Sequence, residues 1–204
     1  MHTQVYIVRH GQTAMNQEGK LQGRTDIELN DTGIRQAEET AARLKEKGIV
    51  FDHVFSSPLS RAVQTAALIS GKKDIQTDER LIEMDYGPYE GMDLSAPDEK
   101  IRTFFSDFVH NPAPEGMEQL DSVVRRLGEF LEEIRTREIH GNILISTHAI
   151  AMKGALEYLS PDAKGSYWSK YIGNCAVYVC KIKDGRYTVP EELKLSDMKA
   201  MPGV

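Results

Sequence analysis

The sequence predicts an α/β sandwich with a mainly parallel sheet. Short apolar runs rich in β-branched residues, typical of buried strands, alternate with longer segments whose apolar residues recur at helical spacing. Glycine, proline and small polar residues stand at most boundaries between these segments, where connections are expected. With 204 residues, 40% of them hydrophobic, the chain is long enough to bury a full core.

The first strand is expected over residues 5–8, an apolar run that stops at the glycine turn of residues 9–11. A helix is expected over residues 31–47, because apolar or small residues recur there every three or four positions. Asp31 or Thr32 has the side chain of an N-cap for this helix.

A second strand is expected over residues 51–55, followed by a helix with Ser57 as its N-cap and Pro58 as its first helical residue. Residues 75–77 predict a short strand. Residues 92–117 contain several prolines around a short helix with three phenylalanines, and we expect an insertion there that shapes the substrate site.

The second half of the chain predicts a long amphipathic helix over residues 120–139, a strand over 142–147 and a helix that ends at Leu159. A hairpin is expected over residues 176–189, because its centre is an Asp-Gly pair of the type that hairpins favour. The last fifteen residues are polar, and we expect them to be loosely ordered. No linker or repeat is visible, so we expect residues 1–204 to form a single domain.

The charge of the chain limits its partners. Lys and Arg number 25 against 31 Asp and Glu, so the net charge is -6. A protein that binds nucleic acid by counterion release would carry the opposite sign. The negative net charge does not exclude a small anionic substrate, but a few local cations must then attract it.

Two cysteines argue against a secreted disulfide scaffold. Cys175 and Cys180 are five positions apart in an expected strand, so their side chains should point to opposite faces and stay unbridged. No signal peptide or apolar run of ~18 residues is visible. We therefore expect a cytoplasmic protein that has no contact with membranes.

Basic and imidazole side chains follow three of the expected strands. Arg9 and His10 follow the first strand, Ser57 and Arg61 the second, and His148 the strand that ends at residue 147. Ligands of parallel α/β sheets bind beyond the carboxyl ends of the strands. The sequence therefore predicts that these segments meet at one edge of the sheet.

Such a cluster suits a phosphate group. Arg9 and Arg61 can donate paired hydrogen bonds to phosphate oxygens, and Gly11 would let a ligand approach the backbone closely. A neutral histidine could attack phosphorus while a protonated one stabilises the equatorial oxygens. A metal site is the rival use of two histidines, but neither His-x-His nor His-Glu-x-x-His occurs.

A series of short motifs runs in order along the chain. They are Arg9-His10-Gly11-Gln12-Thr13 with Asn16, Gln22-Gly23 with Asp26, Ser56-Ser57-Pro58-Leu59-Ser60-Arg61-Ala62, Glu83-x-Asp85-x-Gly87 with Glu90-Gly91, Gly116-Met117-Glu118, and Ser146-Thr147-His148. Together they resemble the histidine phosphatase (phosphoglycerate mutase-like) family over about residues 4–180. Each motif alone is weak, whereas the collinear series is specific.

The resemblance implies a three-layer α/β/α fold and a role for each motif. His10 would be the nucleophile that accepts the phosphoryl group, and Glu83 the general acid and then the general base. Phosphate-binding roles fall to Arg9, Arg61, His148, Asn16, Gln22 and Gly23. The resemblance also implies that the reaction needs neither a metal nor another cofactor.

The family contains phosphatases and mutases, and we favour a phosphatase acting on small phosphorylated metabolites. Mutase relatives carry a long basic insertion after the acid, whereas here Lys100 and Arg102 are the only Lys or Arg residues between Glu83 and Glu118. The alternatives are a cofactor-dependent phosphoglycerate mutase and a module that binds phosphorylated ligands without turnover. The sequence leaves the substrate and the oligomeric state open.

Overall fold

The computed structural model describes residues 3–137 and 139–195. Its centre is a seven-stranded sheet in the order β3-β2-β4-β1-β5-β6, with β7 also paired to β5. The strands are β1 (Thr3–Arg9), β2 (His53–Ser56), β3 (Gln76–Thr77), β4 (Gly141–Thr147), β5 (Val177–Lys183), β6 (Arg186–Tyr187) and β7 (Glu191–Glu192). Strands β1 to β4 pair in parallel, and β5 to β7 are antiparallel.

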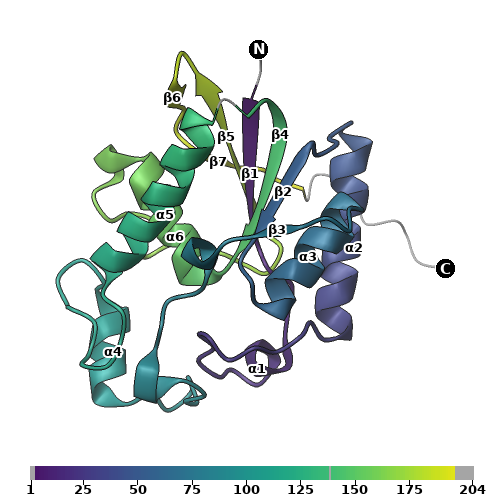
Figure 1. Ribbon diagram of the computed structural model, residues 1–204. Coiled ribbons are helices and arrows are strands. Elements are labelled where there is room, and N and C mark those ends of the chain that lie inside the picture. The colour runs from purple at the N-terminus through teal and green to yellow at the C-terminus, as the bar shows by residue number, and fades with distance from the viewer. Residues whose placement is uncertain (1–2, 138, 196–204) are drawn as a thin grey trace.

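Helices cover both faces of this sheet (Figure 1). Helices α2 and α3 lie on one face, and α5 and α6 on the other, whereas α1 and α4 lie beyond the carboxyl ends of the parallel strands. The helices are α1 (Ala14–Gln17), α2 (Asp31–Glu46), α3 (Ser60–Ser70), α4 (Glu99–Ser106), α5 (Leu120–Thr136) and α6 (Ala149–Leu159). The predicted three-layer α/β/α fold with a mainly parallel sheet is confirmed.

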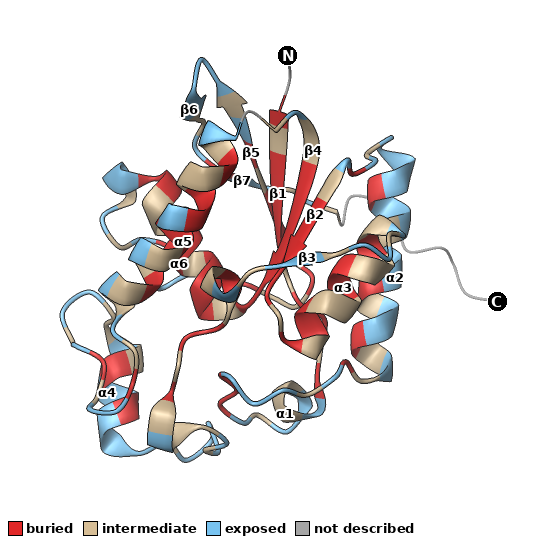
Figure 2. Ribbon diagram, viewed as in Figure 1, coloured by how far each residue is buried: buried red, intermediate tan, exposed pale blue. Residues whose placement is uncertain are grey.

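The alternation of side chains along β1 explains why both faces need cover. Val5 and Ile7 belong to the apolar cluster shared with α5 and α6, whereas Tyr6 and Val8 belong to the cluster shared with α2 and α3. All four are buried, and the red segments of Figure 2 follow the middle of the sheet and the inner sides of these helices. A strand buried on both faces reads as a continuous apolar run, as residues 5–8 do.

Strand register brings the chemically interesting segments together. Arg9 on β1 is paired with Thr147 on β4, and Ser56 on β2 is paired with Ser146 on the same strand. Three residues therefore follow the strands side by side at the carboxyl end of the sheet: His10, His148 and Ser57. At this edge the sequence predicts that the three segments meet.

Two helix starts differ from the sequence prediction. The N-cap of α2 is Asn30, whose side chain accepts the amide of Gly33, rather than Asp31 or Thr32. Helix α3 begins at Ser60, so Pro58 is not its first helical residue. The Ser57 hydroxyl lies 2.7 Å from the ring of His148, and this contact holds Ser57 in the site instead of at the start of the helix.

The carboxyl-terminal part of the chain follows the prediction with two changes. Asp184 and Gly185 both have positive φ, as the tight turn between β5 and β6 requires. Helix α5 ends at Thr136, three residues earlier than expected. Of the fifteen residues expected to be loosely ordered, Glu191–Glu192 form β7 against β5, and residues 196–204 lie outside the described residues.

Residues 92–117 contribute to the core. Ile101 and Phe104 on α4 are completely or almost completely buried, and Ala113 and Met117 join the same apolar cluster. The segment lies beyond the carboxyl ends of the parallel strands (Figure 1), and its role in shaping the substrate site stays a prediction. Within the described residues, no helix is both long and apolar enough to cross a bilayer.

Candidate active site

His10 directly follows β1 and is almost completely buried. Its Nδ1 lies 2.6 Å from the carbonyl oxygen of Gly11, which can only accept, so Nδ1 carries the ring proton and Nε2 keeps its lone pair. Burial, and then the charges of Arg9 and Arg61, hold the pKa of His10 well below its usual value. At neutral pH the ring is therefore uncharged, with a nucleophilic nitrogen.

Arg61 lies beside that nitrogen. Its Nε donates to His10 Nε2 at 3.3 Å, and its two terminal nitrogens donate to the carbonyl oxygens of Thr25 and Gly23 at 2.8 and 2.6 Å. Burial lowers the pKa of Arg61 to about 10, which leaves the guanidinium charged at neutral pH. A fixed cation is thus held against the lone pair of His10.

Arg9 and His148 complete the basic side of the site. Arg9 donates to the carbonyl oxygen of Ile172 at 2.5 Å. The ring of His148 lies 5.2 Å from that of His10, centroid to centroid. Burial, and then the charges of Arg61 and His10, lower the pKa of His148 well below its usual value.

Glu83 is almost completely buried. Its carboxylate accepts the amides of Met84, Ala151 and Ile150 at 2.8, 2.9 and 3.2 Å. Two of these amides belong to the first turn of α6, where the helix dipole also favours an anion. The helix that begins after His148 therefore positions Glu83 as well.

Asn16 and Gln22 belong to one hydrogen-bonded network. Gln22 Oε1 accepts from Thr13 Oγ1 at 2.7 Å and from Asn16 Nδ2 at 3.3 Å. Asn174 donates to the carbonyl oxygen of His10 at 3.0 Å and to Asn16 Oδ1 at 3.3 Å. The network ties α1 and the segment before β5 to the backbone of the central histidine.

Three of these side chains bury a nitrogen that has no hydrogen-bond partner in the described part of the chain: Arg9 Nε, Gln22 Nε2 and His148 Nδ1. The first two are obligatory donors. His148 Nδ1 is a donor or an acceptor according to the tautomer of the ring, whose Nε2 contacts the Ser57 hydroxyl at 2.7 Å. Unpaired buried donors are costly, and the two of Arg9 and Gln22 suit an anion that would accept from both.

The glycines of the motifs serve packing. A Cβ on Gly11 would lie 2.5 Å from the carbonyl oxygen of Gly33. The close approach of α2 therefore requires glycine at position 11, whereas we expected the approach of a ligand to require it. The amide of Gly23 donates to Glu90 and its carbonyl accepts Arg61, so Gly23 positions the arginine. Direct phosphate binding by Gly23 stays a prediction.

Sequence reasoning gave no role to three residues that support the site from behind. Glu90 accepts the amides of Gly23, Arg24 and Thr25, and thereby fixes the loop whose carbonyls hold Arg61. Thr65 accepts the amide of Gly11 and lies one turn after Arg61, a spacing that could have revealed it. Asn174 follows no pattern that marks its contact with His10.

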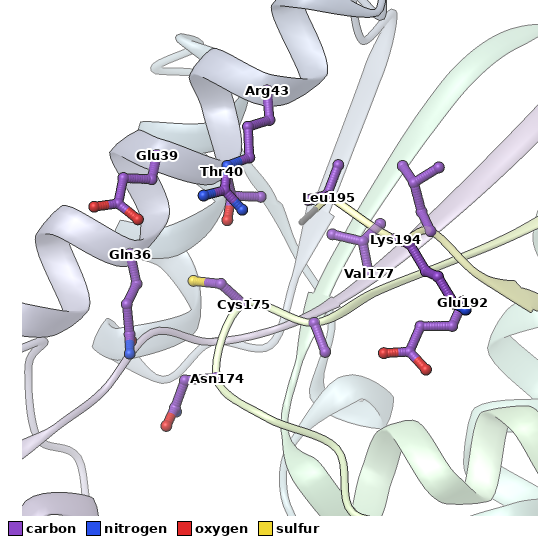
Figure 3. Close-up of a pocket in the computed structure, with 12 residues that line it drawn as sticks. Gln36, Glu39, Thr40, Arg43, Asn174, Cys175, Val177, Glu192, Lys194 and Leu195 are labelled. Atoms are coloured by element: carbon purple, nitrogen blue, oxygen red, sulfur yellow. The ribbon is translucent and has the colours of Figure 1, made fainter. Parts of the chain in front are cut away.

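A hollow of about 260 Å³ lies behind this site, between α2 and the chain around Cys175 (Figure 3). Asn174 lines it, but none of the predicted site residues does. Glu39, Arg43 and Lys194 give its wall both charges, so it offers an anion no advantage. The charge of Arg9 and Arg61 therefore suits a phosphate group better than this hollow does.

Within residues 3–137 and 139–195, no three His, Cys, Asp or Glu side chains are grouped closely enough to hold a metal ion. The remaining histidines lie apart from the cluster where the structure describes them. His110 contacts Asp107 at the surface, and His53 lies in β2. Cys175 and Cys180 are free, as the sequence predicts, and both are buried. Only Cys180 lies in the expected strand, because β5 begins at Val177 and Cys175 has a positive φ before it.

The fold and the basic cluster together define an enzyme of phosphate chemistry with a histidine at its centre. Comparison with known proteins gives the family. The sequence model of the histidine phosphatase superfamily (branch 1) matches residues 5–192, and the chain belongs to this superfamily.

Individual relatives include phosphatases and mutases. Phosphoserine phosphatase 1 of Hydrogenobacter thermophilus is 30% identical over 90% of this chain and 88% of its own length. A 2,3-bisphosphoglycerate-dependent phosphoglycerate mutase of Methylobacterium is 36% identical over 78% of this chain and 81% of its own.

Among solved structures, phosphoserine phosphatase of Entamoeba histolytica is similar over almost the whole length of both chains. A variant in complex with phosphoserine has a TM-score of 0.81 and 27% identity, and covers 95% of this chain and 98% of its own. The complex with 3-phosphoglyceric acid has a TM-score of 0.80 and 28% identity, and covers 94% and 97%.

Proposed function

We propose that the protein is a phosphomonoester hydrolase that forms a phosphohistidine at His10. One observation carries the proposal: a buried neutral histidine with its lone pair on Nε2 lies beside Arg61, in a cluster with unpaired buried donors. Relatives named as phosphoserine phosphatases, one of them solved with phosphoserine and with 3-phosphoglyceric acid, support small phosphorylated metabolites as substrates.

In the first step His10 Nε2 attacks phosphorus, so that a P–N bond forms and the P–O bond to the leaving alcohol breaks. Arg9 and Arg61 neutralise the equatorial oxygens, which is the main requirement of phosphoryl transfer. His148 Nδ1 and the amide of Gln22 add further hydrogen bonds. The leaving oxygen takes its proton from Glu83.

In the second step water attacks the phosphohistidine. Glu83, now a carboxylate, accepts a proton from the water, the P–N bond breaks, and inorganic phosphate leaves with the lone pair restored to His10. To act as an acid, Glu83 must hold a proton when the substrate arrives. The three backbone amides fix the direction of the carboxyl group.

Hydrolysis fits the surroundings better than mutase activity. A mutase must hold a second anionic group and protect its phosphohistidine from water. Lys100 and Arg102, the cations of the segment where mutase relatives bind that group, are exposed on α4, and Arg102 donates to the carbonyl oxygen of Pro97. Because some relatives are phosphoglycerate mutases, isomerisation of phosphoglycerate is the second candidate for the function of this protein.

The test is a panel of phosphomonoesters with released inorganic phosphate as the readout. We expect turnover of several small monoesters by the wild-type protein and none by His10→Ala. A protein that binds phosphate or vanadate tightly but releases nothing from any monoester would instead be a binding module.

Metal independence belongs to the same proposal, because the arginines already supply the positive charge. Activity should survive long dialysis against EDTA. Loss of activity that Zn²⁺ or Mg²⁺ restores would show that the histidines serve as ligands.

A cytoplasmic location is also proposed. Both cysteines are free, as is usual in reducing compartments. Fractionation of cells that produce a tagged chain should recover it in the soluble fraction, and recovery with membranes would contradict this.

A further inference from the structure

Residues 116–118 form a motif that the proposed reaction does not use, although they lie against the segment that carries the general acid. The amide of Glu118 donates to the carbonyl oxygen of Asp85 at 2.8 Å, and Glu118 Oε2 accepts the amide of Asp85 at 3.2 Å. A Cβ on Gly87 would collide with the carbonyl oxygen of Gly116, so glycine at position 87 permits this close approach. The motif is thus fixed to the chain two residues after the acid.

Arg126 on α5 is the partner of Glu118. Its Nε donates to Glu118 Oε1 at 2.8 Å and its Nη2 to Oε2 at 3.1 Å, the paired geometry in which a guanidinium matches a carboxylate. The remaining nitrogen, Nη1, donates to the carbonyl oxygens of Arg80 at 2.8 Å and Ile82 at 2.5 Å. The two side chains of the pair are only 13% and 10% exposed.

These contacts hold the backbone on both sides of Glu83. Arg126 binds the carbonyl oxygen of Ile82, directly before the acid, and Glu118 binds both backbone groups of Asp85, two residues after it. Within residues 3–137 and 139–195, the carboxylate of Glu83 accepts hydrogen bonds only from backbone amides, two of them in the first turn of α6. The place of the carboxyl group therefore depends on where its own backbone segment lies relative to α6.

The chemistry of the pair suits a positioning role. A lysine would supply the same charge, but it could not bind a carboxylate through two parallel hydrogen bonds and reach two carbonyl oxygens from one rigid plane. The alternative is that Glu118 and Arg126 only stabilise the fold. A loss of stability alone would affect all substrates of the folded protein alike.

We propose that Glu118 and Arg126 are a positioning pair that keeps the carboxyl group of Glu83 in place for proton transfer to the leaving oxygen. The inference rests on the proposed function and adds two residues to it. It predicts that breaking the pair slows the step that needs the proton and leaves binding of the phosphate group unchanged.

The test is Arg126→Lys, which keeps the charge and therefore leaves no unpaired carboxylate behind, but loses the rigid fork. In single-turnover rapid-quench experiments, phosphorylation by an alkyl phosphate should slow about ten- to hundredfold, the effect of displacing a reacting group by ~1 Å. Phosphorylation by p-nitrophenyl phosphate, whose leaving group has little need of a proton, should slow less than about threefold. Equal slowing for both substrates would overturn the proposal.

A second variant and a double variant complete the test. Glu118→Gln has nearly the size of the native side chain, should show the same selective loss, and carries the test if Arg126→Lys does not fold. Adding Arg126→Lys to Glu83→Gln should slow the alkyl phosphate less than about threefold further, because the proton that the pair positions is already absent. A full additional loss in that background would also overturn the proposal.

Arg135→Lys is the matched control on the same helix. Arg135 pairs with Glu132 through two nitrogens and donates to the carbonyl oxygen of Gly185, so it makes the same kinds of contact without touching the segment of Glu83. This variant should leave both substrates unchanged. A selective loss in the control equal to that of Arg126→Lys would contradict the assignment.

A measurement without turnover separates this inference from the proposed hydrolysis. The amides of Ile150 and Ala151 donate to the carboxylate of Glu83, so their proton shifts in ¹H–¹⁵N spectra report its position. Both should move upfield in Arg126→Lys, because the hydrogen bonds weaken, and stay in place in Arg135→Lys. If the wild-type protein releases no phosphate but these amides respond, the hydrolase proposal fails and the positioning pair stands. If phosphate is released but the amides do not respond, the positioning pair fails alone.

Discussion

His10 can attack phosphorus only when its ring is neutral, because protonation removes the lone pair of Nε2. Burial is the largest influence on its pKa and the charges of Arg9 and Arg61 act in the same direction, so the ring stays neutral where an ordinary histidine would be half charged. The hydrogen bond to Gly11 fixes the tautomer. If His10 is the nucleophile, as we propose, it therefore needs no separate base.

The titration of the two buried histidines tests this directly. Imidazole nitrogen shifts measured by NMR should show His10 neutral, with its proton on Nδ1, as pH falls from 7.5 through 6.5, and His148 neutral as well. Because the unfolded chain takes up these protons below pH ~6.5 and the folded chain does not, stability should fall on acidification, by at most ~1.4 kcal/mol per pH unit and histidine. Protonation of His10 near pH 6.5 or above would contradict this.

Glu83 should matter in proportion to the leaving group's need for a proton. Glu83→Gln keeps the size of the side chain but removes proton transfer, which is typically worth ~100- to 10,000-fold. In single-turnover rapid-quench experiments, phosphorylation by an alkyl phosphate should slow far more than phosphorylation by p-nitrophenyl phosphate. Equal slowing for both would assign the acid to another group, with Asp85 as the next candidate.

At the scale of elements, the N-cap of α2 separates two interpretations of the sequence. Asn30→Ala should destabilise the protein by ~1 kcal/mol, because its side chain caps the helix, with little effect on activity. Asp31→Ala and Thr32→Ala serve as matched controls and should cost less in urea unfolding. A larger loss in either control than in Asn30→Ala would restore the sequence-based assignment.

The strands and the site edge were predictable because parallel pairing places consecutive strand ends together. Residues 5–8 and 143–145 are clear apolar runs, so the sequence alone places His10 and His148 side by side. Helix starts were harder to predict, since Asn30, Asp31 and Thr32 are all plausible caps and only tertiary contacts distinguish them. Ser57 is a further example: its hydroxyl contacts His148, and α3 begins at Ser60 rather than directly after Ser57.

Residues that support the site through long-range contacts carried weaker sequence signals. Asn174 reaches His10 and Asn16 from the segment before β5, and Glu90 holds the amides of Gly23, Arg24 and Thr25 from far along the chain. Their side chains are common surface types, so nothing local marks them. The predicted single-domain organisation and the site roles taken from the family resemblance stay predictions that biochemistry must test.

For the whole molecule, the fate of the phosphoryl group separates a phosphatase from a mutase. With 3-phosphoglycerate, in the presence and absence of 2,3-bisphosphoglycerate, we expect hydrolysis and little isomerisation that depends on the bisphosphate. The reason is that residues 84–117 offer a second anionic group only Lys100 and Arg102, both exposed on α4. Rapid interconversion of the isomers with negligible phosphate release would establish the mutase reaction.

The central claim is that His10 carries the phosphoryl group. The protein should be mixed briefly with the radiolabelled monoester that it hydrolyses fastest, quenched in alkali and digested, and the labelled peptide sequenced by mass spectrometry. The account predicts an acid-labile, base-stable label on His10 that disappears together with turnover in His10→Ala. Turnover that persists in His10→Ala, or a label on another residue, would contradict it.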